Sequence, residues 1–140
     1  MRPSACRRAK RSTSSFGSPL AHAGRAYFVN ATGVVFCHDL ETGAEVFSNR
    51  LGDSNWATPI AIGQRLYFFG KGGTVFVLSA GPEFEKLAEN PTWEAAPAAE
   101  ENGQRQQFGG AVLYAAAFTQ DRWLLRRGDV LYCIGQSDQK

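Results

Sequence analysis

The chain repeats itself at a spacing of forty residues and without a gap. Residues 18–20 (Ser-Pro-Leu) align with residues 58–60 (Thr-Pro-Ile), and residues 33–36 (Gly-Val-Val-Phe) align with residues 73–76 (Gly-Thr-Val-Phe). A looser third copy ends the chain over residues 122–132. Repeats of this length fold as similar modules that bury their apolar faces against one another, so the fold must be built from stacked units.

Each copy contains short apolar runs separated by glycine-containing turns, a pattern typical of successive antiparallel hairpins. Four strands within about forty residues are typical of one blade of a β-propeller. In the first copy the predicted strands are Pro19–His22, Arg25–Asn30, Val34–Asp39 and Glu45–Arg50. In the second copy they are Pro59–Ile62, Arg65–Phe69, Thr74–Ser79 and Phe84–Asn90.

The last strand of the second copy is predicted against local propensity. Residues 83–89 favour a helix by composition, but the forty-residue alignment places Leu87 at the position of Phe47, which favours a strand. The third copy follows an Ala-, Glu- and Gln-rich stretch, residues 94–107, that we expect to be an exposed insertion. Its predicted strands are Ala111–Ala117, Arg122–Arg126 and Val130–Ile134, and its start is left open between Pro97 and Ala115.

The predicted fold class is therefore all-β, an open, partial β-propeller of about three four-stranded antiparallel blades. Its expected parts are a disordered basic tail (1–17), blade 1 (18–57), blade 2 (58–97), and an insertion loop with an incomplete or irregular last blade (98–140). A closed propeller needs roughly four to eight blades. The blade count therefore predicts that the chain is a C-terminal fragment of a larger propeller, with exposed blade edges that favour self-association.

The charge distribution argues against a nucleic-acid partner. Five of the fifteen Lys and Arg residues lie in the first eleven positions, and the first acidic residue is Asp39. The rest of the chain has ten basic and thirteen acidic residues, so a basic surface is confined to the tail. The tail lacks the apolar run of a secretory signal, and no stretch approaches the ~20 apolar residues of a membrane span.

The three cysteines, Cys6, Cys37 and Cys133, do not predict a disulfide framework, because their number is odd. Cys37 and Cys133 occupy the same slot of the repeat, where the second copy has Val77. Equivalent slots of different modules point the same way, which keeps the two sulfurs apart. We expect both to be reduced, small, buried residues.

The segment from Cys37 to Phe47 resembles the docking motif of the PQQ-like (quinoprotein-like) β-propeller repeat, roughly A-x-D-x-x-T-G-x-x-x-W. Asp39, Thr42 and Gly43 match this motif, while Cys37 replaces its small residue and Phe47 its tryptophan. Asp and Thr can accept backbone N–H groups in a turn, and Gly can adopt a positive φ. The resemblance implies that the five residues form a structural interblade docking motif, with the terminal aromatic packed against the next blade.

The resemblance also raises a catalytic possibility, because members of this superfamily include dehydrogenases that hold pyrroloquinoline quinone (PQQ) and calcium. Such a site needs carboxylate and amide ligands and a carboxylate base. No residue here matches those ligand motifs, so we expect no catalytic, cofactor or metal residues. His22 and His38 align with apolar residues of other copies and are expected to pack, and residues 70–74 (Gly-Lys-Gly-Gly-Thr) are expected to form a hairpin turn, not a phosphate loop.

The expected function is a non-enzymatic propeller module that serves as a protein-interaction scaffold or as a platform for a protein or carbohydrate ligand. Two alternatives remain open at this point: part or remnant of a PQQ-dependent oxidoreductase, and a sensory propeller of a multidomain protein such as a kinase. The resemblance implies a periplasmic or extracellular location, although the sequence shows no export signal.

Overall fold

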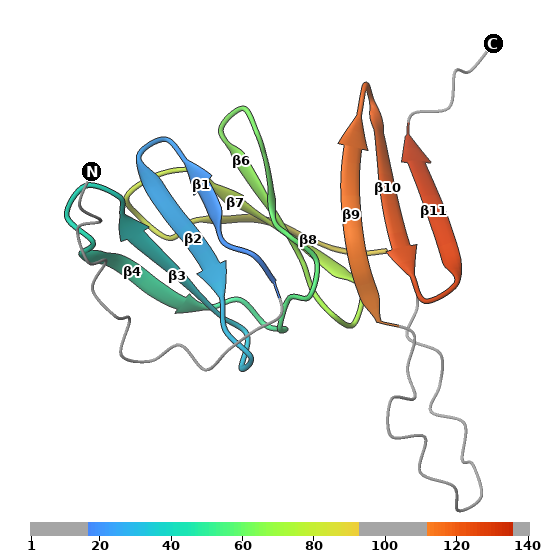
Figure 1. Ribbon diagram of the computed structural model, residues 1–140, viewed down its shortest axis with the longest axis horizontal. Helices are drawn as coiled ribbons and strands as arrows, with labels where there is room; N and C mark the ends of the chain where they lie inside the picture. Colours follow the sequence, from blue (N-terminus) through green and yellow to red (C-terminus); the bar gives the residue numbers. More distant parts are fainter. Residues whose placement is uncertain (1–16, 93–111, 136–140) are drawn as a thin grey trace, which may run out of the picture.

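The computed structural model describes residues 17–92 and 112–135, which form three antiparallel sheets (Figure 1). Sheet 1 contains, in spatial order, β1 (Leu20–His22), β2 (Arg25–Val29), β3 (Val34–Asp39) and β4 (Glu45–Arg50). Sheet 2 contains β5 (Ile60–Ile62), β6 (Arg65–Phe69), β7 (Thr74–Ser79) and β8 (Lys86–Pro91). Sheet 3 contains β9 (Leu113–Thr119), β10 (Arg122–Arg127) and β11 (Val130–Gly135). The predicted all-β class is confirmed.

Local chemistry explains why the chain reverses where it does. Between β2 and β3, the Oδ1 atom of Asn30 accepts hydrogen bonds from the backbone N–H of Thr32 (3.0 Å) and of Val34 (2.9 Å). Gly33 completes this turn with a φ of +78°, a conformation that glycine adopts without a steric penalty. In sheet 2 the predicted hairpin at residues 70–74 occupies the same place, between β6 and β7.

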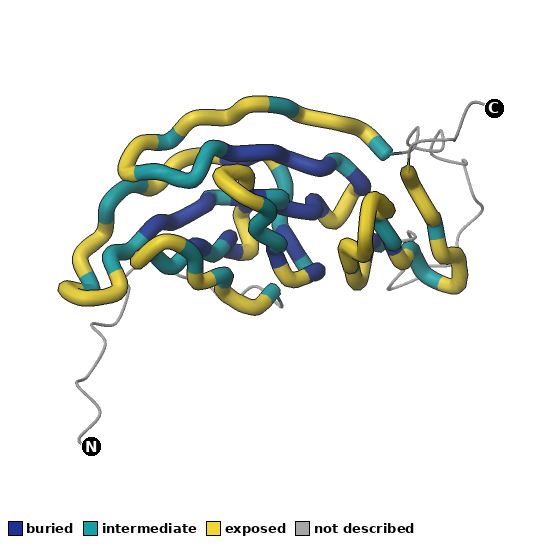
Figure 2. The backbone as a smooth tube through the Cα atoms, turned by 90° about the horizontal axis from the view of Figure 1, so that it is seen from above, coloured by how far each residue is buried: buried dark blue, intermediate teal, exposed yellow. Residues whose placement is uncertain are grey.

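The three sheets lie side by side in chain order, so each presents a face to the next (Figure 1). Strand β1 contacts β5. Buried backbone gathers in the middle of the molecule and exposed backbone lies at its periphery (Figure 2). The larger core cluster lies between sheets 1 and 2 and the smaller one between sheets 2 and 3. The core is therefore made by packing between sheets, as stacked repeats require.

The structure corrects the alignment of β8. Phe47 lies opposite Cys37 in sheet 1, and Ala88 lies opposite Val77 in sheet 2. Ala88, not Leu87, is thus the counterpart of Phe47, and the predicted equivalence of Leu87 is wrong. The physical reason is a longer turn: the bond from Asp39 N to Ala44 O closes the β3–β4 turn, whereas the β7–β8 turn closes one residue later, from Ser79 N to Glu85 O.

Sheet 3 differs from the other two because β11 is its last described strand. Cys133, in this strand, is exposed, so the prediction that it is buried is wrong. The equivalent residues Cys37 and Val77 are buried because the next sheet packs over them, whereas no described element follows β11. The predicted tail (1–17) and insertion (94–107) fall almost wholly outside the described residues. Within residues 17–92 and 112–135, no helix is long and apolar enough to cross a membrane.

Candidate functional site

The turn between β3 and β4 is organised by the side chain of Asp39. Its Oδ1 atom accepts hydrogen bonds from the backbone N–H of Glu41 (3.0 Å), the backbone N–H of Thr42 (2.8 Å) and the Thr42 hydroxyl (3.0 Å). The Thr42 hydroxyl in turn accepts a bond from Ala44 N (3.3 Å), and Gly43 has a φ of +70°. One carboxylate oxygen thus holds the loop closed, and this fixes where β4 starts.

Because the hydrogen bonds from Thr42 favour the charged form, they hold the pKa of Asp39 below its usual value. A carboxyl group whose pKa is depressed by folding stabilises the fold above its unfolded pKa of about 3.9. That contribution is lost as the pH falls through the lower folded pKa. We therefore expect Asp39→Asn, which keeps an acceptor oxygen but removes the charge, to weaken the acid dependence of unfolding below about pH 4. Urea unfolding of the wild-type chain and of the variant between pH 2 and 6 measures how the free energy of unfolding depends on pH. Parallel pH dependences for the two proteins would contradict the prediction.

Sheets 1 and 2 meet in a contact that we call the first seam, formed around Tyr27, Phe47 and Phe84. The Phe47 ring lies 6.4 Å from that of Tyr27 and 5.9 Å, edge to face, from that of Phe84 in the β7–β8 loop. The Tyr27 hydroxyl also lies 3.5 Å from the carbonyl oxygen of Gly81 in the same loop. Aromatic pairs of this geometry add to the free energy of apolar burial. Strand β4 therefore contacts the following sheet through the aromatic ring of Phe47.

Cys37 lies fully buried beneath this seam. Burial raises the pKa of its thiol, and the pKa of the neighbouring Tyr27 hydroxyl is raised for the same reason. Both groups are neutral and packed, which suits a structural role. Cys37 and Cys133 are free thiols, as predicted.

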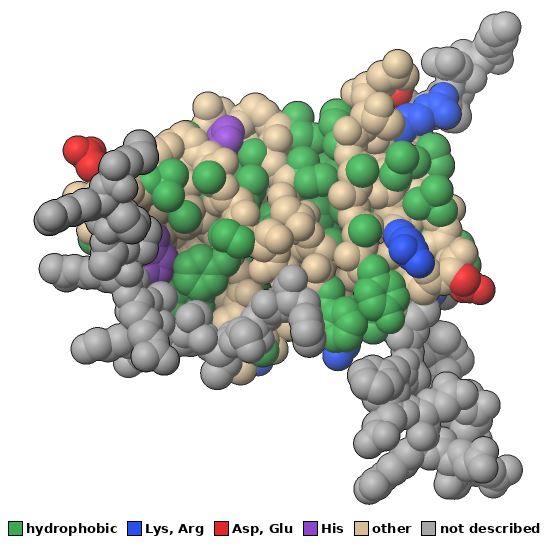
Figure 3. Space-filling model, viewed as in Figure 1, with side chains coloured by type: hydrophobic (Ala, Val, Ile, Leu, Met, Phe, Trp, Pro, Cys, Tyr) green, Lys and Arg blue, Asp and Glu red, His purple; other side chains and the backbone are tan. Residues whose placement is uncertain are grey.

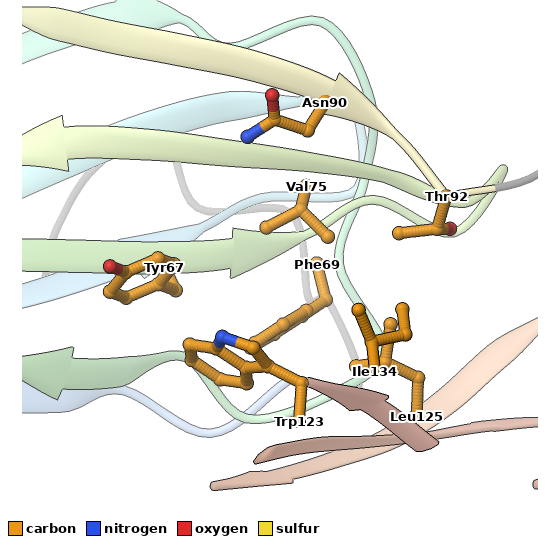
Figure 4. A pocket seen from close by; sticks show the side chains of 8 residues that line it. All are labelled: Tyr67, Phe69, Val75, Asn90, Thr92, Trp123, Leu125 and Ile134. Atoms are coloured by element: carbon orange, nitrogen blue, oxygen red, sulfur yellow. The ribbon is translucent and has the colours of Figure 1, made fainter. Parts of the chain in front are cut away.

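Sheets 2 and 3 meet in the second seam, where Trp123 is the central side chain. Its ring lies 4.7 Å from that of Tyr67 and 5.6 Å from that of Phe69, both on β6. A pocket of about 180 Å³ opens beside these rings (Figure 4). It is lined by Tyr67, Phe69, Val75, Asn90, Thr92, Trp123, Leu125 and Ile134.

Comparison of the two seams explains this pocket. Ala88 replaces the aromatic ring of Phe47 at the equivalent pairing position. Thr92 replaces the buried Leu51, because Leu51 N donates to Gly33 O and Thr92 N donates to the equivalent Gly73 O. No described segment after β11 supplies a counterpart of Phe84. At these three positions the second seam has less side-chain volume than the first, and unfilled volume between packed sheets remains as a pocket.

The remaining candidates from the sequence lie apart from this pocket. His38 stacks on Phe28 (5.5 Å between ring centres) on the face of sheet 1 that points away from sheet 2, and His22 lies half-buried in β1. Asp53 is held in the loop between the sheets, where its carboxylate accepts bonds from Ser54 N (2.8 Å) and Gly72 N (2.6 Å). Among the described residues, no three His, Cys, Asp or Glu side chains are grouped to hold a metal ion.

The pocket could not be recognised in the sequence, because its lining residues come from different repeats. Phe84 and Trp123 were visible as aromatic residues, but their contacts join different repeats. The available signal was the departure of the second and third copies from the Asp39–Phe47 motif, since a missing aromatic at a packing position leaves space. The structure brings the five motif residues together at one end of sheet 1.

No protein-family model matches the chain, and no curated protein matches it. Two solved structures are similar to it: BamB from Moraxella catarrhalis (TM-score 0.59, 15% identity over 87% of this chain) and a chain of the mitotic checkpoint complex (TM-score 0.60, 11% identity over 84%). This chain spans 32% and 34% of their lengths. The first is a PQQ-like propeller and the second a WD40 protein. The fold is that of a partial β-propeller, and the chain is a β-propeller repeat module.

Proposed function

We propose that the chain is a non-enzymatic module of a PQQ-like β-propeller that serves as a protein-interaction scaffold or ligand-binding platform, as part of a larger propeller. The observation that carries this proposal is the first seam. The Asp39 turn positions Phe47 against the following sheet, at 5.9 Å from Phe84. This is the role that the PQQ-like docking motif implies for Cys37, Asp39, Thr42, Gly43 and Phe47.

The similarity to BamB supports the PQQ-like assignment, and the arc of three sheets supports assembly into a longer ring. In a propeller the faces of neighbouring sheets pack against each other, and the loops that join the strands are exposed. The chain follows that division: Tyr27, Phe68 and Leu78 are buried between sheets, whereas the turn at Leu40 is 55% exposed. The exposed loops and edges are the parts that remain for a partner.

A chemical cross-linking experiment tests the scaffold proposal. Lys71 is exposed in the turn between β6 and β7, and Lys86 is exposed at the start of β8. We expect an amine-reactive cross-linker, applied in the native cell, to join them reproducibly to the same partner protein. The control is Lys71→Arg with Lys86→Arg, which keeps both charges and removes both reactive amines. Cross-links that scatter over unrelated proteins would contradict the proposal.

A second measurement addresses the oxidoreductase alternative. Titration of the purified chain with PQQ and Ca²⁺, followed by a dye-linked assay with alcohols and sugars, is expected to show neither binding nor turnover. In this proposal Asp39 is used to close the β3–β4 turn, so its carboxylate is already engaged by Thr42 and Glu41. Calcium-dependent binding of PQQ would contradict the scaffold proposal and favour the oxidoreductase alternative.

A further inference from the structure

We propose that the outer edge of β11 and the pocket of the second seam together bind an extended, acidic segment of a partner protein by strand addition, with one aromatic side chain of that segment filling the pocket. The inference rests on the proposed scaffold function and names its binding site. Strand addition derives affinity from backbone hydrogen bonds, and pockets for individual side chains provide specificity.

The first observation is the edge itself. In sheets 1 and 2 the third strand pairs with a fourth, β3 with β4 and β7 with β8. In sheet 3 the third strand, β11, is paired only with β10 among the described residues. An edge strand presents unpaired N–H and C=O groups that can pair with another chain. Leu131 and Ile134 of this strand are 65% and 43% exposed.

The second observation is the pocket beside that edge. Ile134 of β11 forms part of its wall, opposite Tyr67 and next to Trp123 (Figure 4). A cavity of about 150 Å³ accepts a benzene molecule, so a pocket of about 180 Å³ is large enough for one aromatic ring. Asn90 and Thr92 also line the pocket, and the Thr92 hydroxyl donates a hydrogen bond to Gly73 O. The edge of β11 and a pocket large enough for an aromatic ring are therefore adjacent, because Ile134 belongs to both.

The chain itself contains an example of the segment that would fit. In sheet 2, β7 is followed by Phe84 and then by β8, which pairs with β7. Ile134 takes the place of Leu78, since Trp123 pairs with Ile134 as Leu66 pairs with Leu78. A strand added to β11 in the β7–β8 register would therefore carry its aromatic residue to the Ile134 end, where the pocket lies.

Charge favours an acidic segment. Arg122, Arg126 and Arg127 are the only charged residues within the strands of sheet 3, and Arg122 and Arg126 are exposed on β10, next to β11. Arg122 lies 3.8 Å from Asp121 in the adjoining turn, and Figure 3 shows basic and acidic side chains beside hydrophobic ones over sheet 3. Segment 82–91, the example from sheet 2, has three glutamates and one lysine. Opposite charges across an interface favour encounter and register.

The probe for this site is a synthetic peptide of segment 82–91 (PEFEKLAENP), labelled at its N-terminus and titrated with the full chain while fluorescence anisotropy is recorded. We expect saturable binding. The peptide with Phe84→Ala should bind about 10- to 100-fold more weakly, because an aromatic ring contributes about 1.5–3 kcal/mol on burial and 1.4 kcal/mol is a factor of ten. Hydrogen exchange of the β11 amides should slow when the peptide is bound.

Two protein variants form a matched pair. Ile134→Gln and Leu131→Gln each remove an exposed aliphatic group from β11, but the two residues point to opposite faces because they are three positions apart. We expect Ile134→Gln to weaken peptide binding about tenfold, and Leu131→Gln, at a residue of the edge that does not line the pocket, to weaken it clearly less. Circular dichroism melts of both variants verify that the fold is retained.

Three results would overturn the site: no saturable binding of the peptide, equal affinity of the Phe84→Ala peptide, or equal losses for the two protein variants. Light scattering provides a further check, since a dimer that excludes the peptide would identify a second copy of the chain as the occupant and overturn the assignment to a partner. Such failures leave the scaffold proposal intact, because its cross-linking test uses Lys71 and Lys86 on sheet 2.

Discussion

Replacing Phe68 with alanine is expected to lower the free energy of unfolding by about 3–5 kcal/mol, the range for a fully buried phenylalanine. Phe68 is 0% exposed and belongs to the cluster between sheets 1 and 2. The substitution leaves a cavity that rigid sheets cannot fill by collapse. Urea denaturation followed by circular dichroism measures the change, and Phe68→Leu, which keeps most of the apolar volume, should lose less.

The matched control is Phe28→Ala. Phe28 lies opposite Phe36 as Phe68 lies opposite Phe76, so the two residues occupy the same slot of the repeat. Phe28, however, is only half-buried, on the face of sheet 1 that points away from sheet 2, where it stacks on Phe36 at 5.2 Å. We expect its loss to cost about 1–2 kcal/mol. Equal losses at the two positions would show that packing between sheets does not dominate stability.

Gly33→Ala is expected to be the second most damaging change, at about 2–4 kcal/mol. A left-handed backbone costs a non-glycine residue about 1–2 kcal/mol, and Gly33 has a φ of +78°. A Cβ atom there would also lie 3.0 Å from the backbone N and C of Asp53. That contact is with backbone in the loop that joins the sheets, so the loop must move. Thermal and urea denaturation measure the loss.

Gly24→Ala separates the two causes. Gly24 has a nearly equal φ of +74°, but a Cβ atom there would meet no atom within 4 Å. Only the backbone penalty applies, so we expect a loss of about 1–2 kcal/mol. The difference between the two variants isolates the clash with Asp53. If Gly24→Ala proves as damaging as Gly33→Ala, close packing of the β2–β3 turn on that loop contributes nothing.

Much of the fold could be predicted from local chemistry. The positions of Gly33 and Gly73 marked the same hairpin in two copies, and β2, β3, β6 and β7 lie within a residue of their predicted bounds. The β7–β8 turn could not be predicted, because the insertion of one residue depends on which carbonyl closes the loop. Ser79 N reaches Glu85 O, and this shifts Ala88 into the place of Phe47.

The candidate site was harder to predict than the fold for the same reason. The Asp39–Gly43 turn is a local network within five residues, and its donors and acceptors are encoded side by side. The pocket joins Tyr67 with Trp123 and Ile134, which lie far apart in the sequence. It lies between side chains of sheets 2 and 3, which are contributed by different repeats.

The sequence by itself determined the class of the fold, the number of sheets and the turn at Asp39, because strand periodicity, glycine spacing and side-chain capping act over a few residues. Only the tertiary structure decided which faces are filled and which are left open. Packing between sheets depends on the summed volume of residues from different repeats. Phe47 fills the first seam, whereas the second seam has Ala88 at the equivalent position and a pocket between sheets 2 and 3.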